Sequence, residues 1–420
     1  MAPSRQARPN SHRKATQQNS GNGTEVATSK GHQSSVTGSS STPGIYKKPQ
    51  FRIWLQKGTT HLNCYMRDYQ KRALGEATVH GPSDASKNMC KRLRDSERTP
   101  PQHSRFYDDD AFLLRLESLT IKNEASVTYS LHDLICPSAE ELAYETLHDD
   151  VLGSNYAMFV DHWGESWVKQ PSVLQGFPVP KPDYCAGFSR KAFSEERLAR
   201  LDKVVGEQAR FAPTSWMYFP FLTCEAKSYR DNIIYADNQN AHSMMLAIHA
   251  TVELFRGARC EHRINREILG FSVSYNNDLA RVWAHYPVVS ESRTEIYQKR
   301  IFSFLLNPQD NHNRWMSWNF IRNIYEHWAP KHFQELCEAI DNLDPDWGLP
   351  ETGSTHHAPA TVSDSAELLE NLAVQSSAST IRPNVQTRSR NRKDPSPVGL
   401  HRRPGGRPAE EPKAKKQKKR

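Results

Sequence analysis

The stretch MYFPFLTCEAKSYR, residues 217–230, combines an apolar strand with two ionisable side chains at its end. Residues 217–224 are almost continuously apolar, which is typical of a central strand covered on both faces. Glu225 and Lys227 come next, and because they are two positions apart they lie on the same face of an extended chain. The pattern therefore indicates a buried strand with a carboxylate and an ammonium group at its carboxyl end.

An upstream segment, KPDYCAGF at residues 181–188, has the alternation of a second, shorter strand. Pro182 suits the start of that strand, where a missing N–H does least harm. If the two strands are neighbours, Asp183 converges on Glu225 and Lys227. Cys185 and Cys224 would then approach each other, and we expect buried free cysteines there rather than a disulfide.

Two carboxylates and a lysine at one sheet edge predict a hydrolytic metal site. Carboxylate oxygens are hard ligands that suit Mg²⁺, and we assign Asp183 and Glu225 as the metal ligands. A bound ion lowers the pKa of its water and screens the charge of a phosphodiester. Lys227 could orient or deprotonate that water and stabilise developing negative charge. The competing interpretation is an ion pair between Glu225 and Lys227 at a strand end, worth little if exposed.

Helices and strands alternate around this pair. Ser138 is a plausible N-cap of one helix, and Ser194 can cap another that runs toward Pro213. The clearest helix covers residues 236–257, with Asp237 or Asn238 as its cap and Gly257 at its end. We interpret residues 76–105 and 161–182 as loops, and residues 266–289 as a hairpin. A further strand and two helices follow, which together predict an α/β fold with a mixed sheet.

The charge divides the chain into a body and two basic ends. Residues 1–50 carry +6 and residues 381–420 carry +11, which leaves −9 for residues 51–380 in a chain of net charge +8. Both ends are poor in large apolar residues, so we expect disorder at 1–50 and 346–420. The remainder divides into a poorly defined extension, 51–105, and an α/β domain, 106–345.

The composition also restricts the cellular compartment. The seven cysteines are scattered singly, which favours a reduced intracellular setting over secretion. No signal peptide or membrane span is evident. Residues 413–420, KAKKQKKR, are typical of a cluster read by a nuclear-import receptor, or of a solvated tail that binds polyanions. We expect a nuclear protein, or otherwise a cytoplasmic one.

Pro182, Asp183, Glu225 and Lys227, with a helix after the Glu-x-Lys, resemble the site of the PD-(D/E)XK nuclease superfamily, which has a restriction-endonuclease-like fold. That resemblance implies a mixed central sheet flanked by helices. It also implies that Gln239 on the following helix joins the site. A further carboxylate from an earlier helix is implied too, for which either Glu141 or Glu145 could serve. The chain departs from the tightest form of the motif, because a helix is inserted between Asp183 and Glu225.

A second resemblance covers residues 105–342. The segments KPDYCAGF, YFPFLTCEAKS, NQNAHSMMLAIHATVELF, EILGFSVSYNN and VWAHYPVV, and the helical end of the domain, are similar to an uncharacterised domain of filamentous fungi. This resemblance implies a fungal intracellular protein with a restriction-endonuclease-like fold, and no demonstrated activity.

Two function classes follow from these patterns. The first is a Mg²⁺-dependent phosphodiesterase that acts on DNA or RNA, with Asp183, Glu225, Lys227 and Gln239 in its site. The second is a non-enzymatic nuclear binding or scaffold module built on the same fold. The three residue types in order favour the first class. The acidic body favours the second, because a nuclease usually presents a basic groove.

Overall fold

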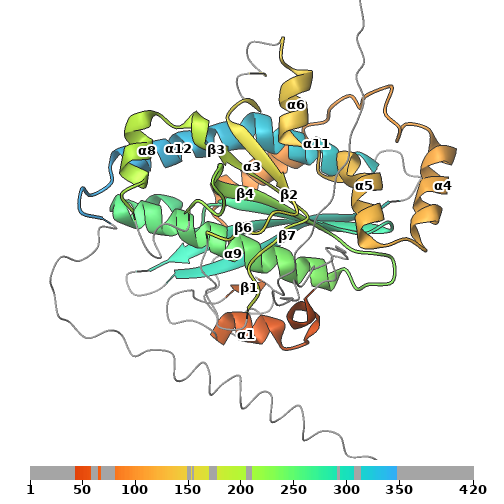
Figure 1. Ribbon diagram of the computed structural model, residues 1–420, viewed down its shortest axis with the longest axis horizontal. Coiled ribbons are helices and arrows are strands. Elements are labelled where there is room, and N and C mark those ends of the chain that lie inside the picture. Colours follow the sequence, from red (N-terminus) through yellow and green to blue (C-terminus); the bar gives the residue numbers. More distant parts are fainter. Residues whose placement is uncertain are drawn as a thin grey trace, which may run out of the picture. The chain divides into compact units, whose positions relative to one another are not determined.

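The computed structural model describes residues 43–57, 65–67, 81–148, 153, 156–169, 177–204, 211–290, 294–306 and 314–347. These residues form a mixed sheet with helices on both faces (Figure 1). The expected disorder at the two ends of the chain, the import-type cluster at 413–420 and most of residues 1–50 lie outside this described part.

The sheet has seven strands in the spatial order β1-β7-β6-β5-β4-β3-β2. Neighbours β2, β3 and β4 are antiparallel, β4 and β5 are parallel, β5, β6 and β7 are antiparallel, and β1 is parallel to β7. The strands are β1 Tyr65–Arg67, β2 Phe159–Trp163, β3 Tyr184–Ser189, β4 Met217–Ala226, β5 Gly270–Tyr275, β6 Leu279–Val289 and β7 Thr294–Leu305.

The helices lie at the ends of the sheet and on its two faces. Those before β3 are η1 Gly44–Lys47, α1 Phe51–Lys57, α3 Asp84–Asp95, α4 Asp109–Leu119, α5 Glu124–Ile135 and α6 Ala139–Glu145. Those after it are η2 Arg190–Ala192, α8 Glu195–Leu201, α9 Ile234–Gly257, η4 Glu261–Ile264, α11 Met316–Asn323, the π-helical turn η5 Ile324–Trp328 and α12 Ala329–Asp341. No helix in the described ranges is both long and apolar enough to cross a bilayer.

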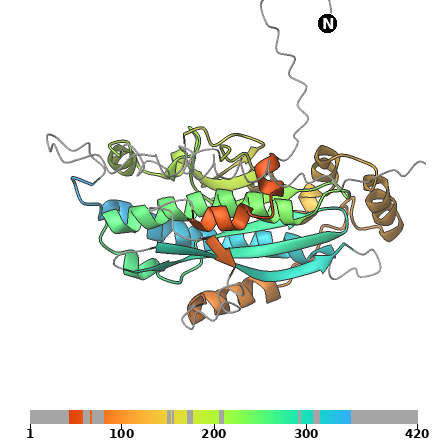
Figure 2. The same ribbon diagram turned by 90° about the horizontal axis from the view of Figure 1, so that it is seen from below.

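Helix α9 covers one face of the sheet and connects the parallel strands β4 and β5. Asn240 anchors it there, because its side chain bonds both the Thr223 hydroxyl of β4 at 2.7 Å and the Val273 carbonyl of β5 at 2.9 Å. Helices α11 and η5 cover the opposite face (Figure 2). There Phe271 packs edge-on against Phe320 and Trp328. Strand β4 is buried along all ten residues, as its apolar sequence predicted.

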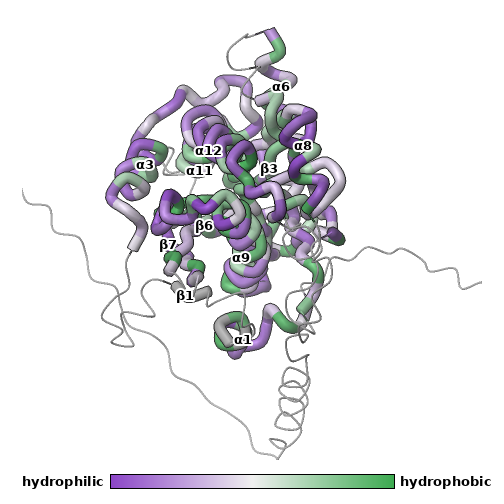
Figure 3. The backbone as a smooth tube through the Cα atoms, turned by 90° about the vertical axis from the view of Figure 1, so that its left-hand side faces the viewer, coloured by the Kyte–Doolittle hydropathy of each residue, from purple (hydrophilic) through white to green (hydrophobic). Residues whose placement is uncertain are grey.

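The N-terminal end of the described chain packs against α9 rather than extending freely. Tyr46, Phe51 and Leu55 are buried, and Figure 1 shows α1 alongside α9, on the far side from α11. The expected boundary between residues 50 and 51 therefore falls inside a packed segment. Helices α3 and α8, by contrast, are mostly hydrophilic along their length (Figure 3).

Several local predictions were wrong, and tertiary packing explains each. Residues 76–105 contain α3, which buries Cys90 and Leu93 despite its polar sequence. Strand β2 begins before the expected loop at 161–182 and pairs with β3 along Phe159–Trp163. Helix α9 begins at Ile234, so neither Asp237 nor Asn238 is its N-cap. The Asp237 carboxylate is buried instead, bonded to Arg281 at 2.7 Å and Trp283 at 2.9 Å on β6.

Candidate functional site

The candidate site forms where β3 begins and β4 ends. These strands are antiparallel neighbours, with Tyr184 opposite Cys224, so Asp183 lies beside the end of β4. One oxygen of Asp183, Oδ2, accepts a 2.8 Å hydrogen bond from the backbone N–H of Ala226, between Glu225 and Lys227. Asp183 is 42 positions from Glu225 and 44 positions from Lys227 in sequence. The hydrogen bond between its carboxylate and the backbone of β4 nevertheless brings it to the same end of the strand pair as these two residues.

Lys227 lies at the centre of this group. Its ammonium nitrogen Nζ is 3.0 Å from Glu124 Oε1 and 3.9 Å from Glu225 Oε2, and it donates a 2.6 Å hydrogen bond to the Ala226 carbonyl. Its side chain is fully buried. Burial pulls the pKa of Lys227 down, but Glu225, Asp183 and Glu124 together outweigh burial and hold that pKa above its ordinary value. Lys227 is therefore an ammonium cation at neutral pH.

Glu225 is 1% exposed, and its carboxylate has an unsatisfied oxygen. Oε2 is buried without a hydrogen-bond partner. Thr223, two residues earlier, bonds to α9, so Glu225 shares the strand face that α9 covers. Burial, and then the negative charge of Asp183, raise the pKa of Glu225 well above its ordinary value. A buried carboxylate with a free acceptor needs either a proton or a cation.

The sequence did not single out Glu124, although it stands closest to Lys227 of the three carboxylates that surround the ammonium group. It is the first residue of α5 and is 13% exposed. Burial raises its pKa to about 7, against the opposing effect of Lys227. Burial likewise raises the pKa of Asp183. The site thus holds three acids whose pKa values are raised and one lysine, an excess of negative charge whenever the acids ionise.

The carboxylate from an earlier helix that lies beside Lys227 is Glu124, not Glu141 or Glu145. Glu141 and Glu145 lie on α6 and line a separate cleft together with Trp163 and Trp318. Helix α5, which precedes α6, reaches the end of β4 and places its N-terminal residue over Lys227. The sequence offered a signal only for the start of α5, because Asn123 is an N-cap residue that accepts a hydrogen bond from the Ser126 N–H.

Gln239 lies on α9, next to the anchoring residue Asn240. It is 9% exposed, and its amide oxygen Oε1 is buried with no hydrogen-bond partner. Its neighbours Asn238 and His242 are bonded to the N-terminal segment, through Arg52 at 2.8 Å and Tyr46 at 2.9 Å. Glu225 is close enough for its charge to add to the effect of burial in raising the pKa of Tyr46. The N-terminal segment therefore closes the α9 side of the site.

The donor set fits a hard divalent cation that keeps part of its water shell. The unpartnered Glu225 Oε2 and the surplus of buried acids favour a cation, and Asp183 retains one oxygen besides Oδ2. Over the described ranges, no three His, Cys, Asp or Glu side chains are arranged to hold an ion. An ion here would therefore take two carboxylates and complete its shell with water and substrate oxygens, as Mg²⁺ commonly does.

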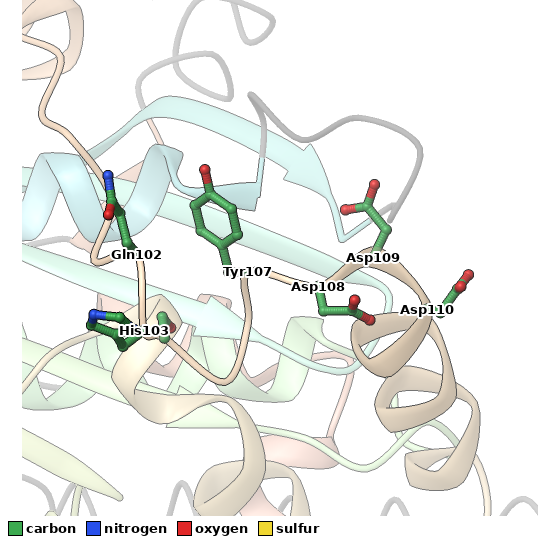
Figure 4. Close-up of a pocket in the computed structure, with 7 residues that line it drawn as sticks. Gln102, His103, Tyr107, Asp108, Asp109 and Asp110 are labelled. Atoms are coloured by element: carbon green, nitrogen blue, oxygen red, sulfur yellow. The ribbon is translucent and has the colours of Figure 1, made fainter.

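A second acidic feature, Asp108–Asp109–Asp110, is structural. Asp108 caps α4 by accepting a hydrogen bond from the Ala111 N–H at 2.7 Å, and Asp109 is 2.5 Å from the buried guanidinium of Arg314. Figure 4 shows the three carboxylates pointing in different directions around a shallow hollow. They do not converge on a ligand position, and Asp108 serves as the N-cap of α4.

Comparison with known proteins yields a family and no further relative. No curated protein and no solved structure matches the chain. A family model described as a domain of unknown function, DUF7924, matches residues 111–340. The match covers more than half of the 420 residues, from α4 to α12, and includes Asp183, Glu225, Lys227 and Glu124. On this evidence the chain belongs to the DUF7924 family.

Proposed function

We propose that this protein is a metal-dependent phosphodiesterase of the restriction-endonuclease-like type, acting on DNA or RNA. The observation that carries the proposal is the grouping of Asp183, Glu225 and Lys227 where β3 begins and β4 ends. The fold supports it: an antiparallel run β2–β3–β4 is followed by α9 and the parallel strand β5, with helices on both faces.

Asp183 and Glu225 would hold the Mg²⁺ ion, which supplies a water of lowered pKa and a counter-charge for the phosphate. Lys227 is held as a cation by its three acidic neighbours, so it acts by stabilising negative charge and by orienting groups, not as a general base. Glu124 fixes the ammonium group at 3.0 Å and thereby positions it. Gln239 has an unpartnered buried amide oxygen, which suits a role as an acceptor beside the same site.

A second candidate function is a binding module of the nucleus that does not cleave its ligand. The observation that favours it is burial, because Glu225 is 1% exposed and Lys227 is fully buried, which keeps both groups out of contact with solvent. The negative net charge of residues 51–380 favours it as well. The import-type cluster at 413–420 is compatible with both functions, since either protein would meet nucleic acid in the nucleus.

Cleavage of plasmid, single-stranded DNA and RNA with Mg²⁺ tests the proposal. Asp183→Asn and Glu225→Gln remove ligand charge without changing shape, and we expect each to lose about 100-fold or more in rate. Glu141→Gln, an exposed carboxylate on α6, is the matched control and should retain full rate. Thermal unfolding with and without Mg²⁺ reports binding independently, because a ligand of the folded state raises its stability. If the wild-type protein neither cleaves any of these nucleic acids nor gains thermal stability from Mg²⁺, the proposal that it is an enzyme is refuted.

A further inference from the structure

The surface beside the candidate site is built from two segments that are far apart in sequence. Residues 44–52 lie against α9, held by the Tyr46 hydroxyl on His242 at 2.9 Å and by the Asn238 side-chain amide on the Tyr46 carbonyl at 2.9 Å. The second segment is the loop from Ser228 to Asn232, which connects Lys227 to α9. Lys47 Nζ lies 3.9 Å from an oxygen of Asp231, which brings the two segments together.

This surface is locally basic on an otherwise acidic body. Lys47 and Lys48 are exposed, and residues 44–57 contain no acid. Arg230 is exposed on the loop, and its neighbour Asp231 is the loop's one carboxylate. Lys181 is exposed near Asp183, where its positive charge acts on the Asp183 carboxylate. Clustered cations of this kind are the electrostatic requirement for a phosphate backbone.

One exposed aromatic ring, Tyr229, and one half-buried ring, Tyr235, lie among these cations. Tyr229 is 54% exposed and precedes Arg230, and the Tyr235 ring centre is 5.8 Å from Lys47 Nζ. Aromatic side chains between cations are the platform on which proteins stack unpaired bases, and stacking accepts any base sequence. We call Lys47, Lys48, Tyr229, Arg230 and Tyr235 the entrance surface.

The entrance surface adjoins the candidate site directly. Tyr229 is two residues from Lys227, and the charge of Asp231 acts on Glu124. Glu225 and Lys227 lie below the protein surface, whereas Asp183 and Glu124 keep some exposure. A rigid duplex cannot bring its backbone to a buried carboxylate without opening, but a flexible single strand can.

We propose that the entrance surface binds single-stranded nucleic acid, with phosphates on Lys47, Lys48 and Arg230 and a base stacked on Tyr229. This inference depends on the proposed function in one respect only, which is that the bound strand would present a phosphodiester to Asp183 and Glu225. Binding itself requires no cleavage, so the strand-binding result and the cleavage result are independent.

Fluorescence polarisation of labelled oligothymidylate and oligouridylate with the full chain tests the inference. We expect Tyr229→Ala to weaken binding about tenfold, the loss of one stacked base. The double variant Lys47→Glu, Arg230→Glu should weaken it about tenfold at near-physiological salt and lower the slope of affinity against salt by about 2. Tyr144→Ala and Lys191→Glu are matched controls on exposed residues outside the surface, and they should bind as wild type does.

The basic ends of the chain also attract nucleic acid, so the position of the bound strand must be mapped. Photocrosslinking with a 5-bromouracil strand, followed by peptide mass spectrometry, should label the segment that contains Tyr229 and Tyr235. Crosslinks confined to other segments, or both surface variants binding as tightly as wild type, would overturn the inference. A duplex that competes as well as the single strand would refute the preference for unpaired bases. The affinities for oligothymidylate and oligouridylate, compared with each other, show whether the surface prefers DNA or RNA.

Discussion

Replacing Glu124 by glutamine should make the protein more stable at alkaline pH, although the change removes an ion pair. Glu124 Oε1 lies 3.0 Å from Lys227, and on that contact alone the substitution would destabilise. Burial and the neighbouring charges of Asp183 and Asp231 act in the opposite direction, and together they raise the pKa of Glu124 to about 7 despite Lys227. Glutamine keeps the shape of the side chain and removes the charge.

The magnitude follows from linkage between protonation and folding. A carboxyl whose pKa rises from 4.5 to about 7 on folding holds its proton in the folded state over that pH window, while the unfolded chain has lost it. The free energy of unfolding therefore falls as pH rises from 4.5 to about 7. At about 1.4 kcal/mol per pKa unit, the loss is about 3 kcal/mol. It needs no discount for screening, because Glu124 is only 13% exposed.

Urea unfolding followed by tryptophan fluorescence, between about pH 5 and about pH 8, measures this difference. The stability of Glu124→Gln relative to wild type should increase by about 2.5 kcal/mol across this range, because part of the loss already occurs below about pH 5. The exposed Glu141→Gln should run parallel to wild type. If wild type instead gained on Glu124→Gln as pH rises, the Lys227 contact would outweigh burial, and the assignment of an excess of negative charge to the site would be wrong.

Two further substitutions test the packing that builds the site. Lys227→Met removes the cation from among three buried carboxylates and should cost about 3–5 kcal/mol of unfolding free energy, more at pH 8 than at pH 5, in the same urea assay. Gly187→Ala would place a Cβ atom 2.6 Å from Met217 Cγ and 3.0 Å from Pro220 Cα, where β3 shifts register against β4. It should cost about 1–3 kcal/mol, whereas Gly44→Ala, with nothing within 4 Å, should have little effect; equal stabilities for the two would contradict the close approach of β3 and β4.

The pairing of β3 and β4 could be predicted because each strand is recognisable from its own short stretch of sequence. The apolar run at 217–224 and the alternation after Pro182 each define a strand from its own residues. Asp183 and Glu225 then converge because the strands are neighbours. The helix between the strands, α8, lies outside this contact, and so the long spacing in sequence does not separate the two carboxylates.

Glu124 and Asp237 could not be placed by the same reasoning, because their partners are distant in sequence. Helix α5 mixes β-branched and polar residues, and its own pattern does not indicate that its first residue reaches Lys227, about a hundred residues later. Asp237 has the residue type and position of an N-cap, but it bonds to Arg281 and Trp283 on β6, which is distant from it in sequence. At Asp237 the buried ion pair with Arg281 outweighs the local preference of an aspartate for the N-cap position.

The buried charges at the end of β4 are an energetic argument for the proposed cation site. A fold that needed only packing at the end of β4 would be more stable with neutral side chains of similar volume, because burying three acids around one lysine costs more than their attraction returns. Glu225 Oε2 has no hydrogen-bond partner, and its one close cation is Lys227 Nζ at 3.9 Å. A divalent cation would bind that oxygen. It would also offset the free-energy cost of burying the acids, because carboxylates that repel one another would then be attracted to the same positive charge. The loss of stability expected when Glu124 and Glu225 ionise is therefore the energetic counterpart of the proposed cation affinity. Substitutions that prevent this loss of stability should also abolish cation binding.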